Sequence, residues 1–364
     1  MSSAREEFAA AAPPRRGPRP RLLVRVPNWL GDLLMAEPVL RAADEAGGAT
    51  LVGDPRILGV FDGALANCER LYSDDPRLWR GHDAALLLTG SFRTALTALR
   101  AGIPLRAGQA RDARGLLLTH SLAPARERGR TPLGLGVHGR GRRWLPRPFG
   151  SVCVELAALV GLAVRERRPR LMPDWAASEH VRRRLEAVGI APGSNFMVAN
   201  VGSRPGSAKG APTELWSSML AALALRTDLP CVLVSGPGEE ALEAQIHAAA
   251  PRRNSRAVSL PQPALGLCEL AALFSQARVV VTADNGPRHL AVAVGTPVVA
   301  ILGPTDPRHT ADHLEHTRLV RSPVPCGPCH LEVCPLSGPA HKSCFTRIDP
   351  DEVVRAVLEL AHAL

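Results

Sequence analysis

Residues 22–32 read LLVRVPNWLGD, and their pattern indicates the fold class of this 364-residue chain. An apolar run ends at Val26, Gly31 permits a tight turn of the backbone, and Asp32 stands where a helix is expected to begin. This order predicts a strand, a loop and a helix N-terminus. Ligands of open α/β sheets bind outside the carboxyl ends of the strands, so Asp32 is a candidate general base. The alternative is that Asp32 only caps the helix, a position that suits aspartate.

The same alternation of short apolar runs and helical spacing continues along the chain, which predicts parallel βαβ units. In the first half we expect strands at 22–26, 50–52 and 84–88 and helices at 32–46, 91–100 and 151–162. In the second half we expect strands at 196–200, 231–235, 278–282 and 297–302. The helices expected there span 212–226, 239–249, 266–276, 287–294 and 349–363. The pattern therefore predicts an α/β protein with two Rossmann-like, doubly wound domains that face a central cleft.

Composition distinguishes the segments outside these units. Residues 1–20 are rich in Ala, Pro and Arg without the apolar run of a signal peptide, so we expect a disordered leader. Residues 165–173 are basic and contain proline, which predicts a linker between domains at 21–170 and 171–364. Residues 126–147 are rich in Gly, Arg and Pro and are expected to form a long basic loop.

Charge and the length of the apolar runs limit the partners. The formal net charge of +10 favours acidic partners such as nucleotides, phosphorylated lipids or nucleic acid. The single Tyr and seven Phe do not interleave with basic residues, which argues against a nucleic-acid surface. The longest apolar stretch, about residues 290–304, is interrupted by Gly and Pro and is too short to span a bilayer. We therefore expect a soluble, cytoplasmic protein whose eight cysteines are mostly reduced.

Residues 279–289, VVVTADNGPRH, form a second strand, turn and helix start. Asp284 ends the strand, Gly286 permits a close backbone approach, and Pro287 suits the first helical turn, where an N–H has no partner. Free amides and the positive dipole end at a helix start bind anions. The segment predicts a pyrophosphate site with Asp284 in reach of sugar hydroxyls. The alternative is an ordinary capped turn in which His289 is a packing residue.

Two further turns follow predicted strands. In residues 200–209, NVGSRPGSAK, the hydroxyl of Ser203 and the charge of Lys209 suit phosphate oxygens, although the spacing is not that of a Walker A loop. A solvated loop is the alternative there. In residues 235–240, SGPGEE, Glu239 or Glu240 suits ribose hydroxyls. The alternative is that these glutamates only favour the helix dipole.

Four cysteines gather near the end of the chain, at Cys326, Cys329, Cys334 and Cys344. Four thiolates suit a tetrahedral zinc site, although only the first pair has the compact C-x-x-C spacing. Reduced thiols and a redox-dependent disulfide are the alternatives. The other four cysteines are dispersed and are expected in the core.

Together these segments resemble glycosyltransferase family 9, the ADP-heptose:lipopolysaccharide heptosyltransferases, and within it the heptosyltransferase II type. Members carry a PNWLGD loop, here residues 27–32, and a D-[ST]-G-x-x-H segment, here residues 284–289. They also carry a G-P-[ST] turn, here residues 303–305, a segment like residues 91–104, and a Cys-rich stretch before the last helix. The resemblance covers nearly everything from residue 21 to residue 364.

The resemblance implies a GT-B fold with an acceptor-binding N-terminal domain and a nucleotide-sugar-binding C-terminal domain. It implies inverting transfer of heptose from ADP-heptose to the lipopolysaccharide inner core, with no cofactor required. The candidate structural zinc rests on the four late cysteines alone. The acceptor would be a phosphorylated core or lipid A at the cytoplasmic face of the inner membrane. Cations near that surface are favourable, and the candidates to meet its phosphates are Arg140, Arg142, Arg143 and Arg147. A solvated insertion is the alternative for this basic loop.

The resemblance also assigns roles to single residues. Asp32 matches the general base that deprotonates the acceptor hydroxyl, and Lys209 is the second catalytic residue because it and Ser203 match positions that contact the diphosphate. Asp284 matches the carboxylate that binds the sugar, and Glu239 is our choice for the ribose. The remaining substrate-binding candidates are Asn28, Gly31, Asn285, Gly286 and His289.

Three positions depart from the family pattern and bear on the identity of the donor. Ala211 replaces a Trp, Asn285 stands where Ser or Thr is usual, and Pro287 has no N–H to offer a phosphate. Alternative functions are a family 9 transferase with another donor sugar or acceptor, and a GT-B nucleotide-sugar hydrolase or epimerase. A non-catalytic binding protein is a further alternative, and a nucleic-acid role would rest on net charge alone.

Overall fold

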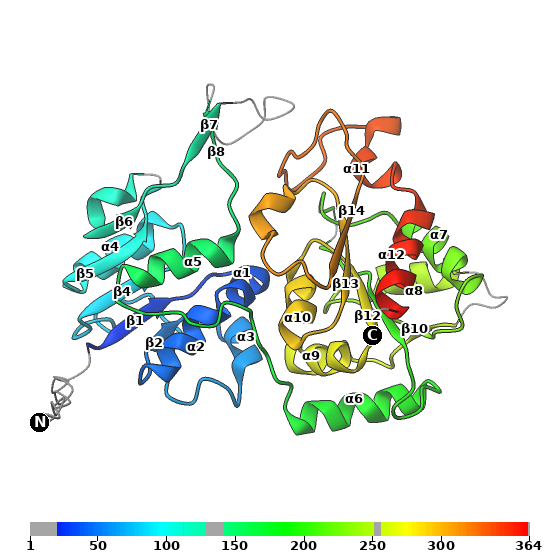
Figure 1. Ribbon diagram of the computed structural model, residues 1–364, viewed down its shortest axis with the longest axis horizontal. Helices are drawn as coiled ribbons and strands as arrows, with labels where there is room; N and C mark the ends of the chain where they lie inside the picture. The colour runs from blue at the N-terminus through cyan, green and yellow to red at the C-terminus, as the bar shows by residue number, and fades with distance from the viewer. Residues whose placement is uncertain (1–19, 112, 129–141, 205, 251–255, 363–364) are drawn as a thin grey trace, which may run out of the picture.

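Two six-stranded sheets, each made of parallel strands, lie side by side in the computed structural model (Figure 1). The model describes residues 20–111, 113–128, 142–204, 206–250 and 256–362. The strand orders of the two sheets are β3-β2-β1-β4-β5-β6 and β11-β10-β9-β12-β13-β14. In each sheet the order reverses beside the first strand of that half, between β1 and β4 and between β9 and β12, which defines a doubly wound sheet. The predicted GT-B arrangement of two Rossmann-like halves is confirmed.

The first half is built around strands that are buried on both faces, as in other helix-covered parallel sheets. Its strands are β1 (Leu22–Arg25), β2 (Thr50–Val52), β3 (Glu69–Leu71), β4 (Ala84–Leu87), β5 (Leu105–Gln109) and β6 (His120–Leu122). Its helices are α1 (Leu30–Met35), α2 (Glu37–Glu45), α3 (Pro55–Leu58), α4 (Phe92–Arg100) and α5 (Phe149–Ala158).

The second half repeats this plan with longer apolar strands. Its strands are β9 (Met197–Asn200), β10 (Cys231–Val234), β11 (Ala257–Ser259), β12 (Val279–Ala283), β13 (Val298–Leu302) and β14 (Thr317–Arg321). Its helices are α6 (Trp175–Ala187), α7 (Thr213–Ala224), α8 (Glu240–Ala249), α9 (Leu267–Gln276), α10 (Gly286–Val294), α11 (Ser343–Thr346) and α12 (Pro350–His362). Every residue of β12 and β13 is buried, because helices cover both faces of the sheet.

Two predictions about local structure were wrong. The single helix expected at 32–46 is two helices, α1 and α2, that meet at Ala36. Pro38 explains the break, because it has no N–H to continue the helical hydrogen bonds from α1.

The second prediction, the long loop at 126–147, is wrong at its two ends, and residues 129–141 lie outside the described ones. Its ends form an antiparallel pair, β7 (Arg126–Arg128) and β8 (Arg142–Trp144), in which Arg126 lies opposite Trp144. The basic composition hid this pairing, which depends on backbone hydrogen bonds rather than on apolar side chains. Arg140 lies outside the described residues, and so does the predicted leader except for Pro20.

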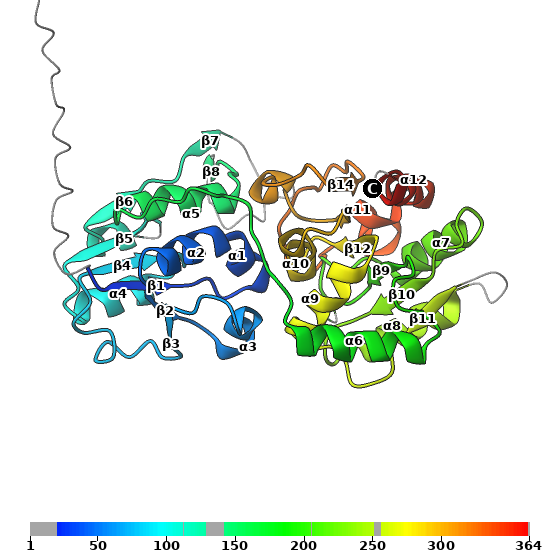
Figure 2. The ribbon, with the colours of Figure 1, turned by 60° about the horizontal axis from the view of Figure 1, so that its bottom comes forward.

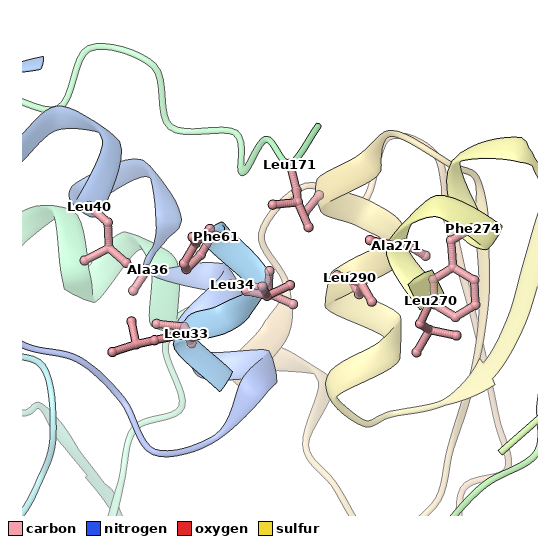
Figure 3. Packing of buried hydrophobic residues seen from close by; sticks show 14 of the residues in the cluster. Leu33, Leu34, Ala36, Leu40, Phe61, Leu171, Leu270, Ala271, Phe274 and Leu290 are labelled. Atoms are coloured by element: carbon pink, nitrogen blue, oxygen red, sulfur yellow. The ribbon is translucent and has the colours of Figure 1, made fainter. Parts of the chain in front are cut away.

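One apolar cluster runs through both halves. It includes Leu33 and Leu34 of α1, Leu171 of the connecting segment, and Leu290 of α10, all of them buried. Figure 3 shows Leu34 on the side of α1 that faces Leu290. Since burial of each leucine side chain contributes about 2 kcal/mol, the two halves hold each other through a shared core.

Glycines on α1 and α10 let the two halves approach each other closely. A Cβ on Gly31 would lie 2.8 Å from the ring atom Cδ2 of His289, and a Cβ on Gly286 would lie 3.1 Å from the Cβ of Leu30. Only glycine lets the two helix starts come this close without displacing a neighbour.

Polar bonds tie the halves together beside this contact. The amide of Leu171 donates to the carbonyl of Ala293 at 2.9 Å. Asp312 of the second half accepts from the Ser151 hydroxyl at 2.9 Å and from the Ser151 amide at 3.2 Å, near the start of α5. The connecting chain then leads into α6, which lies along the second half (Figure 2). None of the helices among the described residues is long and apolar enough to cross a membrane.

We predict that Gly31→Val destabilises the protein by about 1–3 kcal/mol, the usual cost of overpacking a close contact. The added methyl groups would have to displace the ring of His289. The measurement is the midpoint of thermal unfolding. Gly90→Val is the control, because a Cβ at Gly90 meets nothing within 4 Å. Equal midpoints for the two variants would show that the α1–α10 contact is looser than described.

Candidate active site

The contact between the two halves brings the carboxyl ends of their central strands face to face. Helix α1 follows β1 and helix α10 follows β12, and these two helices are in direct contact. The turns after β1 and β12 therefore lie on opposite walls of one cleft. Both turns lie at the switch points of their sheets, where ligands of doubly wound folds bind.

Asp32 lies in the first turn of α1, but it does not cap the helix. The N-cap residue is Trp29, and no side chain makes a capping bond there. Burial raises the pKa of Asp32 to about 6, the positive charge of Lys209 lowers it, and the negative charge of Asp284 raises it. Lys209 and Asp284 both come from the second half, so the fold brings three predicted site residues into electrostatic reach of one another.

Asp284, at the end of β12, is held by two side chains that the sequence analysis did not single out. Its Oδ1 accepts from Arg288 Nη1 at 2.6 Å, and its Oδ2 accepts from Thr305 Oγ1 at 2.6 Å. Arg288 is 1% exposed and also donates to the hydroxyl and carbonyl of Thr310. Burial opposes ionisation of Asp284, but Arg288 and Thr305 outweigh it and hold its pKa below the usual value.

His289, on the next turn of α10, is a neutral side chain at the boundary between the halves. Burial lowers its pKa to about 3, Arg288 and Lys209 lower it further, and Asp284 opposes them. Its ring lies against Gly31. His289 therefore packs between the halves, and its contact with substrate stays a prediction.

The start of α10 offers free backbone donors to the cleft. The N-cap residue Asn285 makes no side-chain capping bond to the helix, so the first amides of α10 have no partner within it. Instead, the Asn285 side chain accepts from Thr282 Oγ1 at 3.0 Å, and Thr282 accepts from Asn200 Nδ2 at 3.0 Å. This chain of bonds fixes the ends of β9 and β12 relative to each other. The resulting amide cluster suits an anion.

The loop after β9 carries Lys209 to the same cleft. Lys209 is exposed, and its side chain makes no hydrogen bond or ion pair to the part of the chain that is described. Ser203 lies against Gly210 at the base of the loop. The loop is braced from behind on both sides of Lys209: the Ala208 amide donates to the carbonyl of Glu332 at 2.7 Å, and Lys342 Nζ donates to the carbonyl of Gly210 at 2.9 Å.

The two glutamates after β10 take different positions. Glu239 Oε2 accepts from the Gly236 amide at 2.9 Å and lies against Gly202 of the neighbouring β9 turn. Glu240 only accepts from the Gly238 amide, at 3.0 Å. Glu239 is therefore the glutamate beside the switch point, and its contact with a ribose stays a prediction.

The turn after β1 completes the opposite wall. Asn28 accepts from Arg25 Nη2 at 3.0 Å, and Arg25 is itself paired with Asp74 at 2.8 Å. Trp29 is 62% exposed, and the guanidinium carbon of Arg204 lies 5.6 Å from the centre of its ring. This cation–π contact joins the turns after β1 and β9 across the cleft.

A pocket of about 330 Å³ opens beside Asp32 in the first half. Its polar lining includes Asn28, Asp32, Gln109, Arg111 and Arg147. Arg147 also pairs with Glu155, which the predicted contact with lipid phosphates did not anticipate. Gln109 and Arg111 are not among the predicted site residues, because β5, the strand that ends at Gln109, was not predicted.

The four late cysteines do converge. Cys326, Cys329, Cys334 and Cys344 line one small pocket behind the Lys209 loop. Burial raises the pKa of Cys344 to about 11, and the other three sulfurs add to the effect. Within the described ranges, no group of three or more His, Cys, Asp or Glu side chains is arranged to hold a metal ion. The zinc site stays a prediction.

Comparisons with known proteins agree on one family. A family model described as glycosyltransferase family 9 (heptosyltransferase) matches residues 154–339, just over half of the chain. Lipooligosaccharide heptosyltransferase 2 of Campylobacter jejuni is 28% identical over 166 residues, which are 44% of this chain and 50% of that protein. Its counterpart in Haemophilus influenzae is 24% identical over 82% of this chain and 79% of that protein.

Lipopolysaccharide heptosyltransferase 1 of Pseudomonas aeruginosa is 31% identical over 25% of this chain, and the match spans only 29% of that protein. Among solved structures, ADP-heptose LPS heptosyltransferase II of E. coli has a TM-score of 0.67 at 20% identity, with 94% of this chain and 98% of that one covered. A family 9 transferase of Veillonella parvula has a TM-score of 0.71 at 16% identity, with 95% and 98% covered. At identities of 16–20%, these structural matches establish that the fold is shared, and nothing beyond the fold.

We predict that Arg288→Met costs about 3–5 kcal/mol of the free energy of unfolding, because it leaves the buried charge of Asp284 without its cation. Chemical denaturation measures this cost. Arg318→Met is the matched control, since Arg318 pairs with Glu359 on the surface. We expect no measurable change in the control. Equal stability of both variants would contradict a structural role for the Asp284–Arg288 pair.

We predict that Asp32→Asn stabilises the protein at pH 8. The pKa of Asp32 rises from 3.8 to about 6 on folding, so ionised Asp32 destabilises the folded state by at most about 3 kcal/mol above pH 6. The cost of ionised Asp32 decreases as the pH falls from about 6 to 3.8, so Asp32→Asn should stabilise the protein less at pH 4.5 than at pH 8. Denaturation curves at both pH values measure it. A gain that is equal at both would exclude the buried charge as its cause.

Proposed function

The chain belongs to glycosyltransferase family 9, and from this we propose that it is an inverting transferase that moves heptose from ADP-heptose to the lipopolysaccharide inner core. The chain aligns with 29% of the Pseudomonas aeruginosa relative and with 50% of the Campylobacter jejuni relative, so donor, acceptor and stereochemistry are all part of the proposal. The observation that supports it most is the meeting of Asp32 from one half with Lys209 and Asp284 from the other.

Asp32 is the proposed general base. With its pKa near 6 it is mostly ionised at neutral pH, yet it is a stronger base than an ordinary carboxylate. It takes the proton from an acceptor hydroxyl bound in the adjoining pocket. The hydroxyl oxygen forms a bond to the anomeric carbon as the bond from that carbon to the diphosphate oxygen breaks. Attack opposite the leaving group inverts the anomeric configuration.

The second half stabilises the departing ADP. The electron pair of the broken bond moves onto the diphosphate, whose growing charge suits the free amides at the start of α10 and the ammonium of Lys209. Asp284, held ionised by Arg288, suits hydroxyls of the transferred sugar. Glu239 suits the ribose. The bound diphosphate also offsets the charge of Lys209, which makes Asp32 a stronger base when the donor is present.

The acceptor of this reaction is a phosphorylated lipid, so we propose that the chain works in the cytoplasm at the surface of the inner membrane. The formal net charge of +10 supports attraction to an anionic surface. No cofactor takes part in the proposed reaction.

The deciding experiment measures ADP release from ADP-heptose with and without a core acceptor that ends in heptose. We expect release only with acceptor, and a kcat/KM that is half-maximal near pH 6, where Asp32 of the free enzyme gains its proton. Asp32→Asn should lower kcat at least about 100-fold while ADP binding is retained. Asp228→Asn, an exposed carboxylate beside Arg256, is the control and should leave kcat unchanged.

The same assay separates the alternatives. ADP release without acceptor would indicate a nucleotide-sugar hydrolase, and turnover with a different nucleotide sugar from a donor panel would indicate another family 9 activity. Full activity of Asp32→Asn would remove Asp32 from the role of base. Nucleotide binding without turnover on any acceptor would indicate a binding protein.

A further inference from the structure

One residue of the second half lies in the pocket of the first. Of the described residues that line the pocket beside Asp32, His309 is the one that comes from beyond the connecting segment. It lies on a short 3₁₀ turn, η4 (Pro307–Thr310), that follows β13 and the Gly303–Thr305 turn. The pocket is therefore complete only when the two halves are docked as described.

The backbone and ring of His309 are held in place. Its amide donates to the carbonyl of Asp306 at 3.1 Å, and the Asp306 carboxylate accepts from the Arg308 amide at 3.0 Å. The ring meets the ring of His330 edge-on, with centres 5.2 Å apart and planes at 85°. His330 Nε2 accepts from the Asp306 amide at 3.2 Å, so its ring is fixed as well. The turn thus presents the imidazole in a defined orientation.

The same turn is connected to the donor side of the cleft. Thr310, the next residue, accepts from Arg288 through its hydroxyl and its carbonyl, and Arg288 pairs with Asp284. His309 and Asp284 are therefore parts of one hydrogen-bonded unit. A ligand that contacts His309 is positioned relative to the group that faces the donor sugar.

The ring of His309 is available to a ligand. The residue is exposed, and neither ring nitrogen has a hydrogen-bond partner in the described part of the chain. Partial desolvation of the ring by the surrounding protein lowers the pKa of His309; Asp306 opposes this, while Arg308 and Arg111 add to it. At neutral pH the ring is therefore an uncharged imidazole with one donor and one acceptor nitrogen. That combination matches a sugar hydroxyl better than a phosphate.

We propose that His309 hydrogen-bonds a hydroxyl of the acceptor sugar and positions that sugar for attack, so that the second half of the chain helps to select the acceptor. The inference rests on the proposed function, because it takes the pocket beside Asp32 as the acceptor site. The ligand class is a polyhydroxylated sugar ring. His309 acts here as a specificity-determining contact, with Asp32 as the base.

The kinetic test compares His309→Ala, His309→Gln and the control His316→Ala, an exposed histidine of the same half outside the pocket. Loss of one neutral hydrogen bond predicts an increase of about three- to tenfold in the acceptor KM for His309→Ala. The donor KM and the affinity for ADP should stay unchanged. His309→Gln, which keeps a donor and an acceptor, should restore part of the loss. Thermal unfolding of the three variants checks that each is folded.

A binding test is independent of turnover. The measurement is NMR of protein isotope-labelled at the histidine rings, with ADP bound, during titration with O-deacylated core oligosaccharide that ends in heptose. The NMR signal of His309 is assigned from its absence in His309→Ala. We expect the oligosaccharide to shift the His309 signal and to leave the His316 signal in place.

The two tests separate the two proposals. A shifted His309 signal without any transfer in the wild type supports the contact and contradicts the transferase. Transfer by the wild type with an unchanged acceptor KM in His309→Ala contradicts the contact alone. The contact is also overturned if the His309 signal does not move, or if His309→Ala weakens ADP binding as much as it raises the acceptor KM.

Discussion

The close contact between α1 and α10 is the constraint on which the site depends. Gly31 and Gly286 have no Cβ, so the two helix starts approach until the ring of His289 lies on Gly31. Around this point a single apolar cluster continues from one half to the other. A side chain at either glycine would push the two helix starts apart and increase the distance between the turn with Asp32 and the turn with Asp284. The width of the cleft is therefore set by how closely the backbones of α1 and α10 approach each other.

Within the cleft, the buried carboxylates lower the stability of the folded state. Asp32 is ionised against the cost of burial, and the nearby Asp284 adds to that cost while Lys209 reduces it. Asp284 tolerates its own burial because Thr305 donates to it and because Arg288, 1% exposed, is fixed beside it by Thr310. A buried pair of this kind gives a defined geometry rather than extra stability. In the proposed reaction, the opposite pKa shifts suit Asp32 to accept a proton while Asp284 stays ionised.

The central strands could be predicted from the sequence, whereas several edge strands could not. Strands β12 and β13 are uninterrupted apolar runs, since both of their faces are buried. The edge strand β3 reads Glu-Arg-Leu, and β7 and β8 are mostly basic. These are held by backbone pairing to a neighbour, which side-chain polarity does not reveal. The break between α1 and α2 was readable from Pro38, but the helical spacing on either side concealed it.

The sequence by itself determined that Asp32, Lys209 and Asp284 each follow a buried strand, because a polar residue after an apolar run marks the binding edge of a parallel sheet. It also predicted that the free amides at the start of α10 suit an anion. Only the tertiary structure decided which of these residues meet, that Arg288 and Thr310 hold Asp284, and that His309 enters the pocket of the opposite half. Those relations join residues far apart in the chain, and they depend on how two separately folded sheets dock, which no local pattern encodes.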